Sequence, residues 1–362
     1  MPMKAMMTTR DRSKQFCERF DLKLPILLAP MAGASAPALS IAVANAGGLG
    51  ACGALLMQPA EILQWAKDFR AGSQGAFQIN LWIPDPAPVR DSNHEDRLHG
   101  FLAEWGPAIA SNAGDAVPPD FAAQCEALLA AAPPMISSIM GLYPAAFIAR
   151  AKARGIAWFA NVTTLAEAKA AQQAGADAIV VQGMEAGGHR GCFNAATAEA
   201  QMVGLMALLP VVVDAVKVPV VATGGIADAR GVAAALVLGA SAVQIGTGFM
   251  RCPEAGIASA WADAIVKAAP EDTMITRAFS GRAGRALATA YVRAAAGDTA
   301  PKPAPYPVQR GLTAAMRTSA QKSNDLDRMQ AWAGQSGSLA RAQPAATLVG
   351  EFWQQAQALL AS

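Results

Sequence analysis

The sequence predicts an α/β protein built as a (β/α)8 TIM barrel, and three features of the chain carry that prediction. Eight short apolar runs occur along the 362 residues, and each is followed by a helical stretch or by a loop and a helix. The runs are almost continuously apolar, which is typical of parallel strands buried on both faces. With 53% hydrophobic and 15% charged residues, the chain can bury a large core. Eight such units favour a closed barrel over the alternative, a doubly wound open sheet.

The order of the elements follows from this alternation. The expected strands cover residues 25–29, 48–52, 77–81, 135–140, 157–162, 178–182, 218–222 and 242–245. A helix is expected over 37–46 after the first strand, and another passes through Glu61 and Trp65 after the second. Ala-rich helical stretches follow the later strands.

Two segments do not follow the alternation of strands and helices, and they suggest a second part of the molecule. Residues 82–119 are rich in Pro, Asp and other polar residues, and beyond about 268 the pattern becomes helical and Pro-interrupted. We expect 1–269 to form the barrel, with an insertion at about 83–119 after the third strand. Residues 270–362 are expected to form a mainly helical cap, or substrate domain, over one end of the barrel.

Composition and charge exclude several classes of partner. The net charge of +2, without a basic cluster interleaved with aromatic residues, argues against nucleic acid. No uncharged apolar stretch reaches the roughly 18 residues that a membrane span needs, and the polar N-terminus predicts no secretory signal. The five cysteines show no spacing typical of zinc ligands. A cytoplasmic protein with reduced thiols and no metal is the expectation.

Barrel active sites form at the carboxyl ends of the strands, which identifies the residues to inspect. Those ends carry mostly small or amide-bearing residues, and almost none is charged. A metal-dependent barrel would show Asp, Glu or His there. We therefore expect a large neutral or anionic ligand that the backbone approaches closely. The strand-end residues include Met31, Ala32, Asn80, Asn161 and Gln182.

The last two units carry a phosphate-binding signal. Gly224 and Gly225 follow the seventh strand, and Gly246 and Thr247 follow the eighth. Glycines there let backbone N–H groups turn toward an anion, and loops after the last two strands of barrels commonly hold phosphate. Asp228 is expected to cap the helix whose positive end favours that phosphate. Tight turns without a ligand are the alternative, and the glycines alone do not distinguish FMN from a sugar phosphate.

The stretch QGMEAGGHRG, from Gln182 to Gly191, places one of only three histidines in a glycine-rich loop after the sixth strand. Histidine exchanges protons near neutral pH, so His189 is the candidate catalytic or substrate-binding residue. His94 and His99 lie in the polar insertion and are expected to be solvated. Glu185 is interpreted as a partner of backbone N–H groups, whereas Arg190 could bind an anion or point to solvent.

Several of these stretches together resemble the nitronate monooxygenases, also called 2-nitropropane dioxygenases. The resemblance extends from about Phe20 to Trp353, and its motifs are APMAGASAPALSIAVANAGGLG, QINL, QGMEAGGHRG, VPVVATGGIADARG and AVQIGTGF. The EAGGHRG element is shared with FMN-dependent enoyl-ACP reductases of the same superfamily. It therefore indicates the superfamily more firmly than the substrate.

The resemblance implies an FMN-bound TIM barrel without a metal. Met31 and Ala32 would then lie near the flavin ring, Asn80 would bond its polar edge, and Gln182 with Gly187 and Gly188 would flank the ring and ribityl chain. Gly224, Gly225, Gln244, Gly246 and Thr247 would hold the phosphate. His189 would be the catalytic residue at the reactive face. Gly334, Gln335 and Ser336 would reach the flavin edge.

The implied reaction is the oxidation of alkyl nitronates, such as propionate-3-nitronate, by FMN and O₂ to a carbonyl compound and nitrite. Three alternatives stay open: an NAD(P)H-dependent FMN reductase of the enoyl-ACP reductase type, a non-redox barrel acting on a sugar phosphate, and a binding protein without chemistry. Some family members carry a second histidine near the position of Ile139, and a tyrosine and a lysine where this chain has Arg310 and Ala314. Tyr306 matches the family. These departures bear on the substrate rather than on the flavin.

Overall fold

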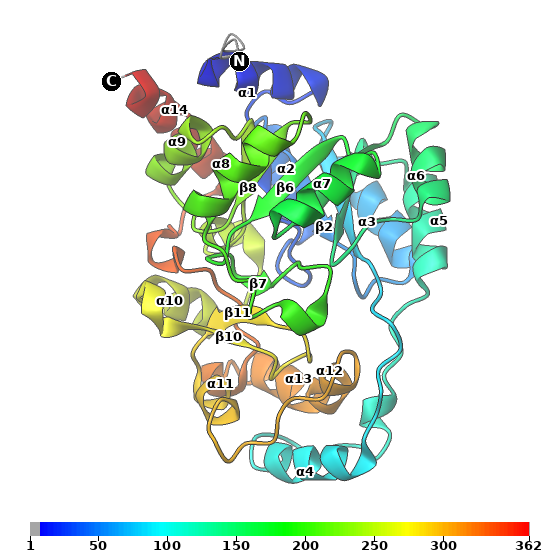
Figure 1. The fold of residues 1–362 in the computed structure, drawn as a ribbon. Coiled ribbons are helices and arrows are strands. Elements are labelled where there is room, and N and C mark those ends of the chain that lie inside the picture. The colour runs from blue at the N-terminus through cyan, green and yellow to red at the C-terminus, as the bar shows by residue number, and fades with distance from the viewer. Residues whose placement is uncertain (1–7, 362) are drawn as a thin grey trace.

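The computed structural model describes residues 8–361 and contains a barrel with a cap beneath it, as Figure 1 shows. The barrel strands are β1 (Ile26–Leu28), β2 (Gly50–Gly53), β3 (Phe77–Trp82), β4 (Met135–Ile139), β5 (Ala157–Val162), β6 (Ala178–Gln182), β8 (Val220–Thr223) and β9 (Ala242–Ile245). All pairs are parallel, in the order β1-β9-β8-β6-β5-β4-β3-β2. A parallel bridge between Leu27 and Leu49 closes the sheet on itself. The predicted (β/α)8 barrel is therefore confirmed, and each expected strand is present within two residues of its expected ends.

Helices surround the strands because each helix buries an apolar face against the sheet. They are α2 (Pro37–Asn45), α3 (Pro59–Gly72), α5 (Phe121–Ala131), α6 (Ala145–Lys152), α7 (Leu165–Gln173), α8 (Leu205–Ala215) and α9 (Ala229–Val237). Their buried residues join those of the strands in one core. As expected, Asp228 caps α9, and its carboxylate accepts from the backbone N–H groups of Arg230 and Gly231 at 3.0 and 3.2 Å.

The N-terminal helix α1 (Thr9–Arg19) closes the amino-terminal end of the barrel. Phe16 packs there with Phe20 and Phe159, and this cluster also contains strand residues that point into the barrel. Arg12 donates to the carbonyl oxygens of Leu236 and Ala240 at the end of α9. Since one end of the barrel is filled with side chains, the opposite end is left for a ligand.

The cap combines helices with a small antiparallel sheet that the sequence did not predict. Its helices are α10 (Ser259–Lys267), α11 (Ala290–Ala295), α12 (Val308–Leu312) and α13 (Ala314–Lys322). Its sheet has the order β10 (Thr273–Thr276), β11 (Gly284–Leu287) and β7 (Gly188–His189). β7 belongs to the loop after β6, so a barrel loop supplies one strand of the cap sheet.

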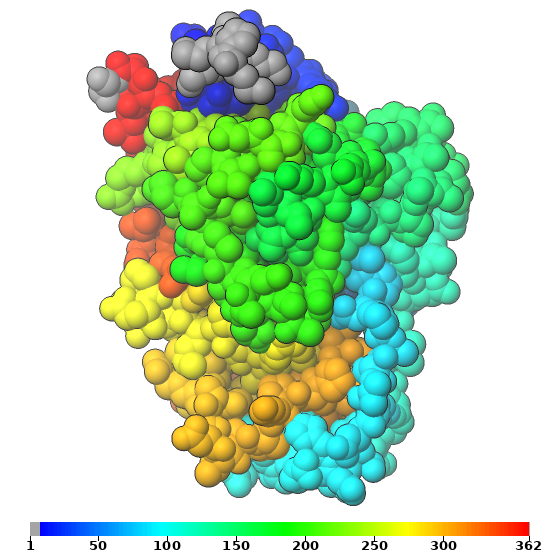
Figure 2. Space-filling model, in the orientation of Figure 1, coloured from blue at the N-terminus to red at the C-terminus, as the bar shows by residue number. Residues whose placement is uncertain are grey.

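The insertion after β3 reaches the cap. It contains α4 (Ser92–Ala103), whose Leu98 and Leu102 pack with Tyr291 and Leu312 of the cap. In Figure 2 this cyan segment runs down the side of the molecule and ends beneath the orange cap helices. The insertion therefore buttresses the cap.

The last helix, α14 (Ala345–Ala361), returns to the barrel wall. Leu348 and Phe352 are buried in the barrel core, and the Phe352 ring lies 5.9 Å from that of Phe249. Figure 1 shows α14 beside α9, at the end of the molecule away from the cap. The division into domains at 1–269 and 270–362 stays a prediction. The structure places α14 against the barrel, and α10, which precedes residue 270, packs with the cap. Across residues 8–361, no helix is long and apolar enough to cross a membrane.

Candidate functional site

A cavity of about 750 Å³ lies at the carboxyl ends of the barrel strands, between the barrel and the cap. All twelve residues that the sequence analysis singled out line it. They are Met31, Ala32, Asn80, Gln182, Gly187, Gly188, His189, Gly224, Gly225, Gln244, Gly246 and Thr247. The structure thus brings the candidates together, while the ligand that each one binds stays a prediction.

His189 lies in strand β7 rather than in an irregular loop, which corrects the sequence-based expectation. Gly284 of β11 pairs with His189, and this partner lies far along the chain, so local sequence could not reveal the strand. The imidazole ring lies between two indoles, with ring centroids 4.7 Å from Trp82 and 4.8 Å from Trp332. Its Nε2 atom lies 2.7 Å from Oγ of Ser280. The ring is therefore held on three sides at the cavity wall.

The surroundings of His189 favour the neutral imidazole. Burial is the largest cause and lowers the pKa of His189 from 6.5 to about 3. The positive charges of Arg310, Arg282 and Arg317 add to the shift, in that order. At neutral pH the side chain therefore carries no charge, and one ring nitrogen can donate a hydrogen bond while the other accepts one.

Two side chains brace the segment around His189. The Gln182 amide donates to the carbonyl oxygen of His189 at 3.0 Å and accepts from the backbone N–H of Gly191 at 2.8 Å. Arg190 is buried and donates to the carbonyl oxygens of Gln182 and Thr163. Arg190 was expected either to bind an anion or to point to solvent. It does neither, because its guanidinium donates to backbone carbonyl oxygens within the protein. The two side chains fix the loop on which the histidine stands.

The ends of β8 and β9 present unpaired backbone donors. Within the described part of the chain, no group accepts from the N–H groups of Gly224, Gly225 or Gly246. Gly224 and Gly225 have φ values of +109° and +70°, which an L-residue rarely adopts. Consecutive residues in such conformations turn their N–H groups into a concave anion-binding arrangement. This part of the cavity can hold a phosphate.

A cap segment lies directly over these donors. The Gly334 N–H donates to Oγ of Thr247 at 3.0 Å, and the Gln335 N–H donates to the Glu185 carbonyl oxygen at 2.9 Å. The Glu185 carboxylate accepts from the Leu205 N–H at the start of α8. The structural role inferred for Glu185 is therefore confirmed, and the cap is tied to the phosphate end of the cavity.

Two buried donors in the cavity wall have no protein acceptor. Nδ2 of Asn161 and Nε1 of Trp82 are in this state, and their residues are 7% and 8% exposed. Buried polar atoms are nearly always paired, so these two are suited to acceptor atoms of a bound molecule. Nearby, Nδ2 of Asn80 donates to Oγ of Ser137, and Oε1 of Gln244 accepts from Nε2 of Gln78. Among the described residues, Oδ1 of Asn80 and Nε2 of Gln244 have no hydrogen-bond partner.

Several cap residues of this site were not predicted from the sequence. Trp332 and Arg317 line the cavity, and buried Ser280 contacts the histidine from behind. Arg310 and Arg317 stand on two separate helices, α12 and α13, so their spacing in the sequence could not show that both reach the cavity. No local pattern identified Ser280.

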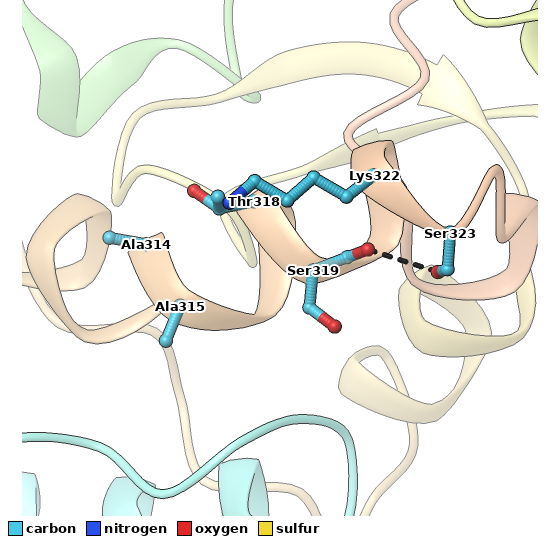
Figure 3. A pocket seen from close by; sticks show the side chains of 6 residues that line it. All are labelled: Ala314, Ala315, Thr318, Ser319, Lys322 and Ser323. Carbon is cyan, nitrogen blue, oxygen red and sulfur yellow. Dashed lines mark hydrogen bonds between the residues drawn. The ribbon is translucent and has the colours of Figure 1, made fainter.

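A second, shallow pocket lies along α13 and is drawn in Figure 3. Its lining residues are Ala314, Ala315, Thr318, Ser319, Lys322 and Ser323. Lys322 is the one charged side chain among them, and Oγ of Ser323 donates to the Ser319 carbonyl oxygen at 2.9 Å. This pocket lacks the concentration of polar groups found at the strand ends. Among residues 8–361, no group of three or more His, Cys, Asp and Glu side chains could hold a metal ion.

Fold and site together define an enzyme of the (β/α)8-barrel class whose cavity lies at the carboxyl ends of the strands under a cap. The family model for nitronate monooxygenase matches residues 14–355, so the chain belongs to the nitronate monooxygenase family. A nitronate monooxygenase of Paraburkholderia phytofirmans is 36% identical over 352 residues, which cover 96% of each chain.

Solved structures show the same relationship. The nitroalkane oxidase of Streptomyces ansochromogenes has a TM-score of 0.86 and 34% identity, covering 95% of this chain and 99% of its own. FabK of Thermotoga maritima has a TM-score of 0.75 and 26% identity, covering 96% of this chain and 97% of its own. The resemblance inferred from the sequence motifs is therefore confirmed at the level of the family.

Proposed function

We propose that this protein binds FMN and oxidises alkyl nitronates with O₂, yielding a carbonyl compound and nitrite. Family membership supports the general activity. One observation carries the proposal. The neutral imidazole of His189, which two indoles and Ser280 hold in place, lines the same cavity as the unpaired N–H donors of Gly224, Gly225 and Gly246. A histidine and a phosphate-binding end in one cavity fit a phosphate-bearing redox cofactor and a small substrate.

The residues present fit FMN. Its phosphate would take the donors at the ends of β8 and β9, close to the N-terminus of α9, whose dipole favours an anion. Its ring and ribityl chain would lie along Met31, Ala32, Asn80, Gly187 and Gly188. Gly188 lines the cavity with a φ of +77°, and nothing lies within 4 Å of the Cβ that another residue would add. A flat ligand can therefore approach this backbone closely.

The bound flavin would supply the redox chemistry, and the protein would supply binding and orientation. With Nε2 held by Ser280, the Nδ1 atom is the ring nitrogen of His189 left for a substrate. An imidazole whose pKa is lowered to about 3 is a weak base, so the role of His189 is to donate a hydrogen bond from Nδ1–H to an oxygen of the nitronate. The two indoles beside the ring hold it in place.

Oxygen consumption and nitrite release test the proposal. Purified, FMN-loaded protein is given an alkyl nitronate in air, and we expect O₂ uptake with nitrite formation. NADH oxidation without nitrite formation would instead indicate the reductase alternative. If the protein binds no flavin under any loading condition, both the nitronate-oxidising function and the reductase alternative are wrong.

A further inference from the structure

We propose that Arg310 is the residue that binds a second anionic group of the substrate, so that the protein selects nitronates carrying a carboxylate away from the nitronate carbon. This inference rests on the proposed function. It names a specificity-determining residue and a substrate class for the same cavity.

The first observation is that the Arg310 guanidinium has no partner. Arg310 is half-buried and lines the cavity with His189. Across residues 8–361, no side chain or carbonyl accepts a hydrogen bond from its guanidinium, and no carboxylate forms an ion pair with it. A guanidinium offers five donors in a fixed, planar arrangement that matches a carboxylate. None of the Arg310 nitrogens is fully buried, so a carboxylate that enters the cavity can reach them.

The second observation is that the neighbouring cations are less available to a ligand than Arg310. Arg282 is buried against Asp85, with Nε and Oδ2 3.1 Å apart. Arg317 donates to Oγ of Thr313, to Oε1 of Gln330 and to the Arg310 carbonyl oxygen, so three of its five N–H donors are occupied. These acceptors are neutral, so Arg317 keeps its positive charge beside Arg310.

The third observation is that acidic residues of the cavity do not neutralise this charge. Two carboxylates belong to the lining, Glu61 and Glu185. Glu61 accepts from the Gln58 N–H at the start of α3, and Glu185 accepts from the Leu205 N–H at the start of α8. Both are engaged at helix N-termini, where negative charge is stabilised. The cap side of the cavity is left with a net positive charge that favours a dianionic substrate.

The geometry also separates the two anionic ends of such a substrate. Arg310 stands on α12 in the cap, whereas His189 stands on β7 at the edge of the barrel. A nitronate held at His189 would extend its far end toward the cap. A carboxylate there would receive two parallel N–H bonds from Arg310, and an alkyl group there would leave the guanidinium unpaired.

A pair of substrates tests this with the FMN-loaded protein. Propionate-3-nitronate has a carboxylate at its far end, and in 3-methylbutyl-1-nitronate an isopropyl group of similar shape replaces it. We expect Arg310→Met to lower kcat/KM for the first by roughly 10- to 100-fold, the value of a charge-assisted hydrogen bond, mainly through KM. For the second, kcat/KM should stay within about threefold of wild type. Arg310→Lys should restore part of the loss, because it keeps the charge without the planar donor pair.

Arg293→Met is the matched control, because Arg293 is an exposed cap arginine outside the cavity. It removes the same charge and should leave both kcat/KM values unchanged. An equal loss for the two nitronates in Arg310→Met, or an unchanged ratio, would overturn the proposal. If neither nitronate is oxidised by the wild-type protein, the proposed function fails instead.

Calorimetric titration gives a readout that does not depend on turnover. Succinate has the spacing of propionate-3-nitronate with a carboxylate in place of the nitronate. We expect it to bind wild-type protein and the Arg293→Met variant, and to bind Arg310→Met and Arg310→Gln at least about 10-fold more weakly. Equal binding of succinate to wild type and both Arg310 variants would refute the second-anion site.

Discussion

Nε2 of His189 lies 2.7 Å from Oγ of Ser280, and this contact joins a barrel loop to the cap across 91 residues of sequence. Ser280 is buried, and its hydroxyl oxygen accepts from the backbone N–H of Arg282 at 3.3 Å. A hydroxyl that accepts there can donate its proton to Nε2, which puts the proton of the neutral imidazole on Nδ1. The cap therefore helps set which nitrogen of the histidine meets the substrate.

Replacement of His189 by alanine tests its catalytic role. We expect His189→Ala to bind FMN as wild type does, because its side chain contributes nothing to the phosphate end of the cavity. Turnover of an alkyl nitronate should fall by roughly 10²- to 10³-fold, the usual value of one positioned hydrogen-bond donor to an oxyanion. His94→Ala is the control: His94 is half-buried, lies outside the cavity lining and contacts the Lys302 carbonyl oxygen in the cap. Full activity in His189→Ala would remove the role assigned to the residue.

The protonation state of His189 can be measured directly. The chain has three histidines, so Cε1 labelling gives three NMR signals, and the His189→Gln variant assigns one of them. Burial lowers the pKa of His189 to about 3. The imidazole should therefore stay neutral, with no change in its chemical shift, as the pH falls from 8 to 5. An inflection near the ordinary histidine value of 6.5 would contradict the burial argument.

The proposed phosphate site, formed by the N–H groups of Gly224, Gly225 and Gly246, is tested by placing a negatively charged side chain there. Gly225→Asp should yield protein with little FMN, because a carboxylate there repels phosphate and occupies its donors. Its Cβ would also lie 3.3 Å from Cβ of Glu185. Gly256→Asp is the control for backbone strain, since Gly256 has a similar φ of +65°, has nothing within 4 Å and lies outside the cavity lining. A Gly225→Asp protein with a full complement of FMN would refute the phosphate site.

The contact between Thr247 and Gly334 should stabilise the closed cap. Thr247→Val keeps the shape of the side chain but leaves the buried Gly334 N–H without an acceptor. We expect a loss of about 1–3 kcal/mol in the free energy of unfolding and faster release of FMN. Urea denaturation and flavin fluorescence measure the two effects. Thr247→Ser keeps the hydroxyl and should behave as wild type; a Thr247→Val protein that also does so would show that the contact is dispensable.

The barrel could be predicted from the sequence because its strands are short, apolar runs whose pairing follows chain order. The same logic located the strand-end residues, since parallel strands all end at one rim. Gly224 and Gly225 were recognisable because their φ values require glycine. His189 was recognisable because glycines surround it at such a strand end.

The cap half of the site was far less predictable. Ser280, Trp332 and Arg317 reach the cavity from segments whose positions depend on tertiary packing. β7 was missed because a two-residue strand exists only through its pairing with β11. Arg310 could be noted as a departure from the family, but only the structure shows that its guanidinium has no partner.

The most direct test of the central claim is an anaerobic titration of the purified, FMN-loaded protein with propionate-3-nitronate, followed by flavin absorbance. The account predicts that the oxidised flavin spectrum is lost on addition of the nitronate and returns with nitrite formation when O₂ is admitted, because the cofactor carries the redox step. A flavin spectrum that does not change with propionate-3-nitronate or with alkyl nitronates, but is bleached by NADH, would contradict it.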